Sequence, residues 1–119
     1  FSQVGVARAS ASETIGALDD WLAAGRHGDM EWMATRRDLR ADPRTLLPEC
    51  RSVVAVALDY GQPLPTGDGP KIARYALGRD YHRVLRDKLK KLAADIPGAT
   101  RACVDSAPIL EREWAHRAG

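Results

Sequence analysis

The sequence predicts an α/β domain with a small sheet flanked by helices, because short apolar runs that suit strands alternate with amphipathic segments that suit helices. Its 119 residues, 45% of them apolar, are enough for one modest core and no more than one domain. Charged residues make up 29% of the chain, a usual share for folded proteins, so global disorder is not expected.

The first half of the chain is expected to hold one strand, over residues 3–7, followed by helices. A helix with one apolar face should come next, capped by Ser10 or Ser12 and ended by Gly25, because serine side chains accept hydrogen bonds at helix starts and glycine suits helix ends. After another short helix, Asp42-Pro43 pairs a cap with a proline at the first helical position and predicts a brief helical turn.

The second half is expected to begin with a strand over residues 53–58, a continuous apolar run typical of a strand covered on both faces. Residues 61–70, with three prolines and three glycines, should form a loop. Residues 100–104 are predicted to form a further strand, and a last helix, opened by Pro108, is predicted over residues 108–117.

The clearest helix is predicted over residues 81–95, with Asp80 as its cap and apolar side chains at helical spacing along one face. Basic residues concentrate around its start: residues 71–91 contain eight Lys or Arg against two Asp. The formal net charge of the chain is only +2, which does not by itself predict nucleic-acid binding. The local clustering is the stronger indication of an anionic partner.

Asp105 is the first candidate for chemistry, because it directly follows the predicted strand 100–104 and strand ends in α/β proteins face ligand crevices. An unperturbed aspartate, with a pKa of about 3.9, is almost fully ionised at pH 7, so a general acid here needs a pKa raised by roughly 3 units. Desolvation under a large apolar surface is one way to raise it. The alternative is that Asp105 is an ordinary ionised helix cap.

Three other places carry candidate ligand-binding side chains, each with a structural alternative. Arg112 is either half of a surface ion pair with Glu111 or a guanidinium that faces a substrate. Arg40 either lies in a solvated turn or reaches a buried ligand. The segment over residues 74–82 is either a basic loop before a capped helix or a surface for phosphates and bases. Its candidate contacts are Arg74, Tyr75 and Arg79.

Several classes of protein are excluded by missing patterns. Cys50 and Cys103 show neither metal spacing nor the density of a disulfide scaffold, so both are expected to be free thiols in a reducing cytoplasm. His27, His82 and His116 share no metal-ligand spacing. The sequence has no Gly-rich phosphate loop, nucleophile elbow or CxxC motif, and no apolar run near the ~20 residues that span a bilayer.

Four segments match a known family in the same order along the chain. They are residues 27–33 (HGDMEWM), 40–48 (RADPRTLLP), 73–82 (ARYALGRDYH) and 105–112 (DSAPILER). Together they resemble the epoxyqueuosine reductases, cobalamin-dependent enzymes of queuosine tRNA modification. Any one segment would be a weak signal, whereas four in order are a strong one, and the likeness covers nearly the whole chain.

The resemblance implies an oxidoreductase that converts epoxyqueuosine to queuosine at the tRNA wobble position with base-off cobalamin and two 4Fe-4S clusters. It implies a nitroreductase-like cobalamin-binding domain in which Asp105 donates a proton to the epoxide oxygen. The implied partners are the tRNA anticodon stem-loop and an electron donor, with no membrane and a monomeric enzyme. The implied cobalamin contacts are Arg40, Ala73, Asp105 and Arg112, and the implied tRNA contacts are Arg74, Tyr75 and Arg79.

The cysteine runs that hold the two clusters in this family do not occur in the sequence, which has no starting Met and ends at Gly119. We therefore expect residues 1–119 to be the N-terminal cobalamin-binding and catalytic portion of a longer protein, without its ferredoxin-like domain and without turnover alone. Two other functions stay open at this point. One is a different cobalamin protein, such as a reductive dehalogenase or a cobalamin-trafficking protein; the other is a non-enzymatic RNA-binding module.

Overall fold

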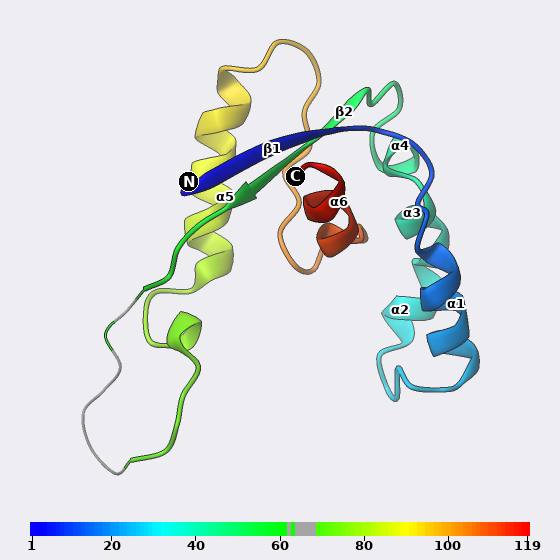
Figure 1. The fold of residues 1–119 in the computed structure, drawn as a ribbon, viewed down its shortest axis with the longest axis horizontal. Coiled ribbons are helices and arrows are strands. Elements are labelled where there is room, and N and C mark those ends of the chain that lie inside the picture. Colours follow the sequence, from blue (N-terminus) through cyan, green and yellow to red (C-terminus); the bar gives the residue numbers. More distant parts are fainter. Residues whose placement is uncertain (62, 64–68) are drawn as a thin grey trace.

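The computed structural model of the chain describes residues 1–61, 63 and 69–119 (Figure 1). Most of the loop expected over residues 61–70 therefore lies outside the described residues. The elements are β1 (Gln3–Arg8), α1 (Ile15–Ala23), α2 (Glu31–Thr35), α3 (Arg37–Ala41), α4 (Pro43–Leu46), β2 (Ser52–Ala57), the 3-10 turn η1 (Arg74–Ala76), α5 (Tyr81–Ala94) and α6 (Glu111–Arg117). The predicted α/β class is confirmed at this level.

The described elements are spread around α6 instead of being packed into one compact core. In Figure 1, α6 lies beneath the two strands, with α1 to α4 on one side of it and α5 on the other. The radius of gyration, 16.4 Å, exceeds the roughly 13–14 Å of a compact domain of this length. Within the described ranges, no helix is both long enough and apolar enough to cross a membrane.

The strands β1 and β2 form an antiparallel pair with one packed face. Val4 pairs with Val56 and Val6 with Val54, so these side chains share the face that points away from α6. Val4 and Val6 are 62% and 61% exposed there. The strand predicted over residues 53–58 is confirmed, but the prediction that both its faces are covered is wrong, because Val54 on the outer face is 38% exposed, an arrangement that antiparallel sheets allow.

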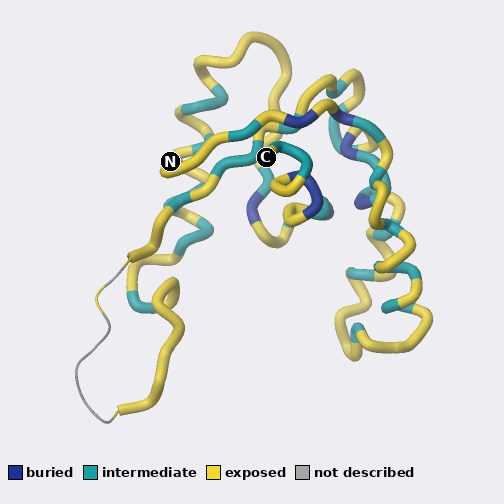
Figure 2. Tube along the Cα trace, in the orientation of Figure 1, coloured by how far each residue is buried: buried dark blue, intermediate teal, exposed yellow. Residues whose placement is uncertain are grey.

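The other face of the sheet packs on α6. Trp114 of α6 is 1% exposed, and Ala7 of β1 is also buried (Figure 2). Gly5 allows the two elements to approach, because a Cβ at this position would lie 2.5 Å from the carbonyl oxygen of Ala118. A glycine is therefore required where β1 crosses the end of α6.

Glu113 connects α6 to the segment that precedes α1. Its carboxylate accepts hydrogen bonds from the hydroxyls of Ser12 and Thr14, both at 2.5 Å, and from the backbone N–H of Glu13 at 2.8 Å. Burial alone would raise the pKa of Glu113, but these donors lower it to about 2. Glu113 is therefore a buried, ionised anchor between the two ends of the chain.

Two of the predicted helix caps are confirmed and one is wrong. Asp42 and Asp80 each accept a hydrogen bond from the backbone N–H two residues later, at 2.9 and 3.0 Å, at the starts of α4 and α5. The predicted cap at Ser10 or Ser12 is wrong, because α1 begins after Thr14 without a side-chain cap and the Ser12 hydroxyl donates to α6 instead.

The helix predicted over residues 81–95 is confirmed as α5 (Tyr81–Ala94). Its apolar stripe is half-buried, as at Leu85 and Leu89, and its basic residues Arg83, Arg86 and Lys90 are exposed. The amphipathic pattern is therefore real, although α5 has no fully buried residue among those described.

Two predictions near the C-terminus are wrong. Residues 101–104 are irregular rather than a strand: they pair with neither β1 nor β2, and the backbone turns sharply at Asp105, where φ is +50°. The last helix begins at Glu111 rather than at Pro108. Residues 105–109 form a bend, so Pro108 and Arg112 are not one turn apart on a helix.

Candidate functional site

Asp105 lies in the bend before α6, not at the end of a strand. Its backbone adopts the left-handed conformation, which aspartate tolerates better than most residues. The backbone N–H of Asp105 donates to the carboxylate of Glu111, at 2.8 Å, and this bond ties the bend to the first turn of α6. The side chain of Asp105 is 60% exposed. Its carboxylate is thus fixed in position but open to solvent.

The first turn of α5 supplies the partners of this carboxylate. The Tyr81 hydroxyl donates to Asp105 Oδ2 at 2.8 Å, and His82 Nε2 lies 3.1 Å from the same oxygen. The other ring nitrogen of His82, Nδ1, lies 2.9 Å from Asp80 Oδ1. Asp80 therefore caps α5 through the His82 backbone and holds the His82 ring with the same oxygen.

The electrostatics of this cluster keep Asp105 ionised. Hydrogen bonds from Tyr81 and then His82 lower the pKa of Asp105, while the bond to Asp105 raises the pKa of Tyr81 to about 12. Hydrogen bonds to Asp80 and Asp105 raise the pKa of His82. Both shifts therefore favour a proton on His82 over a proton on Asp105.

This arrangement corrects part of the expectation for Asp105. Without an apolar cover the carboxylate is ionised, as expected, but it is not a helix cap, because the residue at the N-cap of α6 is Leu110. The surface ion pair considered for Glu111 and Arg112 is not formed either. The Glu111 carboxylate binds the backbone of Asp105, and Arg112 is exposed.

A concavity of about 400 Å³ adjoins the cluster and is lined by the tyrosines Tyr60, Tyr75 and Tyr81. The rings of Tyr60 and Tyr75 meet edge to face at 6.4 Å, and those of Tyr75 and Tyr81 do so at 5.5 Å. Because Tyr81 also binds Asp105, this aromatic surface leads directly to the carboxylate. Arg74 and Arg79 line the same concavity.

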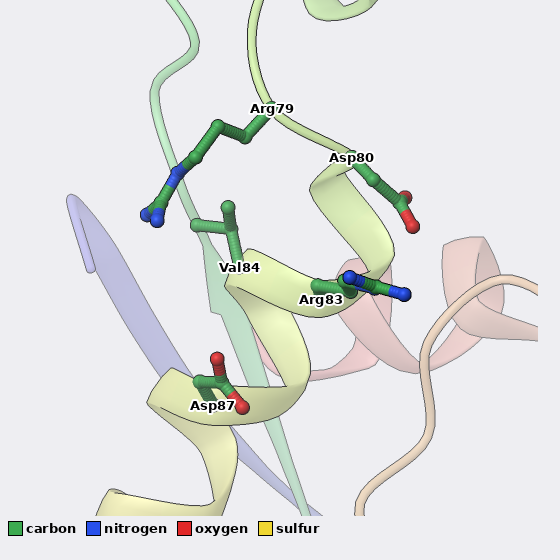
Figure 3. Close-up of a pocket in the computed structure, with 5 residues that line it drawn as sticks. All are labelled: Arg79, Asp80, Arg83, Val84 and Asp87. Carbon is green, nitrogen blue, oxygen red and sulfur yellow. The ribbon is translucent and has the colours of Figure 1, made fainter.

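A second concavity, of about 650 Å³, lies along the first two turns of α5 (Figure 3). It is lined by Arg79, Asp80, Arg83, Val84 and Asp87. Figure 3 shows the guanidinium of Arg79 and the carboxylate of Asp80 pointing in opposite directions. Arg79 thus borders both concavities, and its guanidinium points away from the Asp80 carboxylate (Figure 3).

Arg40 and Ala73, two predicted ligand contacts, lie in different parts of the molecule. Arg40 is only 6% exposed; its guanidinium donates to the carbonyl oxygens of Arg36, at 3.1 Å, and Trp32, at 3.4 Å, and lies 3.4 Å from the sulfur of Met33. Ala73 is exposed just before η1. Figure 1 places α3 and η1 on opposite sides of α6, so the described residues do not bring these two positions together.

The sequence did not reveal Tyr81 and His82 as the partners of Asp105. They lie 24 and 23 residues away along the chain, and His82 carries no metal-ligand spacing. The one local signal was the Asp80 cap, which places the next two side chains on the first turn of a helix. In the part of the chain that is described, no group of three or more His, Cys, Asp or Glu is arranged to hold a metal ion.

Comparison with known proteins identifies relatives that are similar to this chain over its whole length. A family model described as "Epoxyqueuosine reductase QueG, DUF1730" matches residues 40–106, more than half of the chain. No solved structure gives a significant match.

Three curated relatives, each named epoxyqueuosine reductase, show the extent of the similarity. Those of Xanthomonas campestris pv. campestris, Vibrio cholerae serotype O1 and Escherichia coli K12 are 41%, 43% and 44% identical over 132, 131 and 134 aligned residues. Each alignment covers 100% of this chain but only 37%, 36% and 35% of the respective relative. The chain therefore spans little more than a third of the length of these relatives.

Proposed function

This chain belongs to the epoxyqueuosine reductase QueG, DUF1730 family, and we propose on that basis that it forms part of the active site of an enzyme that reduces epoxyqueuosine to queuosine in tRNA. The structural observation that carries the proposal is the Asp105 carboxylate beside a tyrosine-lined concavity, held by two side chains of α5. The family match favours this reaction over the alternatives of another cobalamin protein or an RNA-binding module.

The chemistry requires protons as well as electrons. Removing the oxygen of an epoxide to leave a C=C bond takes two electrons and two protons and releases water. We propose that Asp105 delivers a proton to that oxygen as the C–O bond breaks. Its exposure supports this role, because a bound substrate can reach the carboxylate, and its bonds to Tyr81 and His82 fix where the carboxylate lies.

Cobalamin is the proposed redox cofactor, with contacts from Arg40, Ala73, Asp105 and Arg112. The exposed carboxylate next to a surface of tyrosine rings suits a broad ligand with a flat, largely apolar ring. When bound, cobalamin would supply the electrons for the reaction, which would come from an electron donor through two 4Fe-4S clusters held outside this chain. The Arg40 guanidinium is already bonded to the backbone carbonyls of Arg36 and Trp32, so its proposed cobalamin contact would have to replace or add to these bonds.

The anticodon stem-loop is the proposed macromolecular partner, bound through Arg74, Tyr75 and Arg79. Tyr75 is 51% exposed at the rim of the concavity and offers a ring on which a base can stack. The two arginines line the same concavity and offer positive charge to phosphates. The exposed arginines and lysines of α5 extend this charge away from the site.

We further propose a monomer of nitroreductase-like fold that acts in the cytoplasm. Cys50 and Cys103 are both free thiols in the structure, and burial raises the pKa of Cys103, which disfavours its reactive thiolate. Both thiols are thus compatible with a reducing compartment.

The experiment that tests the proposed activity uses a full-length protein carrying this sequence. It is supplied with cobalamin, a low-potential reductant and an anticodon stem-loop that contains epoxyqueuosine, and the nucleosides are then quantified by mass spectrometry. We expect queuosine to form only with cobalamin and reductant both present. Failure to form queuosine with a cofactor-loaded, RNA-bound protein would contradict the proposed function.

A further inference from the structure

His82 holds both of its ring nitrogens against carboxylates. Nδ1 lies 2.9 Å from Asp80 Oδ1, and Nε2 lies 3.1 Å from Asp105 Oδ2. An ionised carboxylate only accepts hydrogen bonds, so each ring nitrogen must carry a proton to make its bond. A neutral imidazole could satisfy only one of the two carboxylates. The geometry therefore calls for an imidazolium at position 82 whenever Asp105 is ionised.

We propose that the His82 imidazolium stores the proton that Asp105 delivers, and that Asp80 is the positioning residue that orients the ring for this transfer. The inference rests on the proposed function, since it assumes that Asp105 is the group that meets the epoxide oxygen. It adds a source for the proton. Two protons are consumed in each turnover, and an ionised carboxylate can deliver neither until it is itself protonated.

The first step, proton transfer from His82 to Asp105, needs no rearrangement of the cluster. The Nε2–H bond of His82 breaks as the Oδ2–H bond of Asp105 forms, across the 3.1 Å contact. The neutral ring that remains still donates from Nδ1 to Asp80 and accepts at Nε2 from the new carboxylic acid. A half-turn of the Asp105 carboxyl about its Cβ–Cγ bond then presents the proton to the substrate and brings Oδ1 to the position of Oδ2.

Only protons move through these residues. The O–H bond of Asp105 breaks as an O–H bond forms on the epoxide oxygen, and the two electrons of the reaction come from the reduced cofactor of the proposed function. Bulk water then reprotonates His82, whose side chain is 32% exposed. The cycle therefore restores both the imidazolium and the Asp105 carboxylate before the next proton is delivered.

The charged groups around His82 favour its protonated form. Asp80 at the start of α5 and Asp105 in the bend before α6 are both acidic, and the Tyr81 ring stacks on the imidazole at 4.0 Å. Glu111 of α6 adds a further carboxylate, which binds the backbone N–H of Asp105. The positive charge of Arg83 helps to lower the pKa of Asp80 and so keeps that carboxylate ionised. In agreement, the hydrogen bonds to Asp80 and Asp105 raise the pKa of His82.

The first test measures the protonation of His82 directly, by ¹⁵N NMR of the full-length protein without added cofactor. At pH 7 we expect both ring nitrogens of His82 to be protonated, with a titration midpoint above the ordinary value of about 6.5. Asp105→Asn and Asp80→Asn should each lower that midpoint, because each removes a carboxylate that favours the imidazolium. A neutral His82 at pH 7, or a midpoint that neither variant moves, would overturn the proposal.

The second test is the pH dependence of single-turnover epoxide reduction in His82→Gln, with His116→Gln as the matched control. Glutamine keeps an N–H near Asp105 but cannot carry a proton. We expect His82→Gln to reduce the rate about 10-fold or more and imidazole in the buffer to restore part of it. In the unmodified protein the rate should decline as the pH rises above the His82 midpoint, and in His82→Gln this decline should be absent. A rate and pH profile equal to those of the unmodified protein would overturn the relay.

The two proposals fail in different ways. An inactive Asp105→Asn together with a fully active His82→Gln would remove His82 from the proton path and leave Asp105 in its role. A fully active Asp105→Asn would instead remove Asp105 from the proposed function, and the relay with it.

Discussion

The Tyr81 hydroxyl donates to Oδ2 of Asp105 over 2.8 Å, and this bond joins the first turn of α5 to the bend that precedes α6. The same bond has electrostatic effects on both partners. It is the largest cause of the lowered pKa of Asp105, and it raises the pKa of Tyr81 to about 12. Tyr81 therefore stabilises the ionised form of the carboxylate to which it is attached.

Removing this hydroxyl should raise the pKa of Asp105. In Tyr81→Phe the carboxylate loses its strongest donor and keeps only His82, so its midpoint should move up toward the ordinary value of about 3.9. The midpoint is measured by ¹³C NMR of the labelled Asp105 carboxyl. Tyr75→Phe is the control, because Tyr75 lines the same concavity without a hydrogen bond to Asp105 among the described contacts. An unchanged midpoint in Tyr81→Phe would contradict this account.

Glu113 should make the stability of the protein depend on pH below neutrality. Its folded-state pKa of about 2 lies below the ordinary 4.5, so its contribution is complete above pH 4.5 and is lost as the pH falls toward 2. We expect Glu113→Gln to lower the free energy of unfolding by about 3 kcal/mol at pH 7, because a pKa difference of one unit corresponds to roughly 1.4 kcal/mol. The loss is measured by urea unfolding.

The control for Glu113 is Glu31→Gln, which changes an exposed carboxylate in α2 and should alter stability by less than about 0.5 kcal/mol. The difference between Glu113→Gln and the unmodified protein should also shrink as the pH approaches 2. A difference that stays constant from pH 7 to pH 2 would show that the carboxylate is not the stabilising form.

How far the sequence predicts this molecule depends on how local each interaction is. The helix over residues 81–95 and the caps at Asp42 and Asp80 were predicted correctly, because helical periodicity and capping involve neighbours in the chain. The strand over residues 100–104 was wrong, because a short segment of this kind forms a strand only where another strand pairs with it, and that pairing depends on the tertiary fold. The family resemblance is confirmed by the comparisons.

In the candidate site, too, local features could be predicted from the sequence and long-range contacts could not. Asp105 could be singled out from its own segment, but its bonds to Tyr81 and His82 join residues more than twenty positions apart. The bond between Glu113 and Ser12 spans 101 positions. Contacts at such separations depend on the tertiary fold, and no local pattern in a single sequence specifies them. The predicted roles of Asp105, Arg40, Ala73 and Arg112 stay predictions, as do those of Arg74, Tyr75 and Arg79.

Gly5 should tolerate no side chain. A Cβ at this position would lie 2.5 Å from the Ala118 carbonyl oxygen, so Gly5→Ala must push β1 and α6 apart and should cost about 1–3 kcal/mol of unfolding free energy. Gly16→Ala is the matched control: Gly16 lies in α1 with no atom within 4 Å of the added methyl, and alanine there should be neutral or stabilising by up to about 1 kcal/mol. Equal stabilities of the two variants would contradict the close contact.

Arg40 should stabilise the fold even without a ligand. Its guanidinium binds the carbonyl oxygens of Arg36 and Trp32 in a buried position, so Arg40→Gln should lower the free energy of unfolding of the cofactor-free protein by about 1.5–3 kcal/mol. Arg36→Gln, at an exposed position, should change it by less than about 0.5 kcal/mol. If Arg40→Gln leaves the cofactor-free protein as stable as before, the bonds from Arg40 to the backbone do not stabilise the fold, and this account of Arg40 is contradicted.

The most direct measurement of the central claim is single-turnover reduction of an epoxyqueuosine-containing anticodon stem-loop by the full-length Asp105→Asn protein, preloaded with reduced cobalamin. Asparagine keeps the shape of the side chain but cannot release a proton as a carboxylic acid does, and Asp29→Asn, at an exposed position, serves as control. The account predicts that Asp105→Asn reduces the rate by at least about 10²-fold and retains RNA binding. A rate equal to that of the control would contradict it.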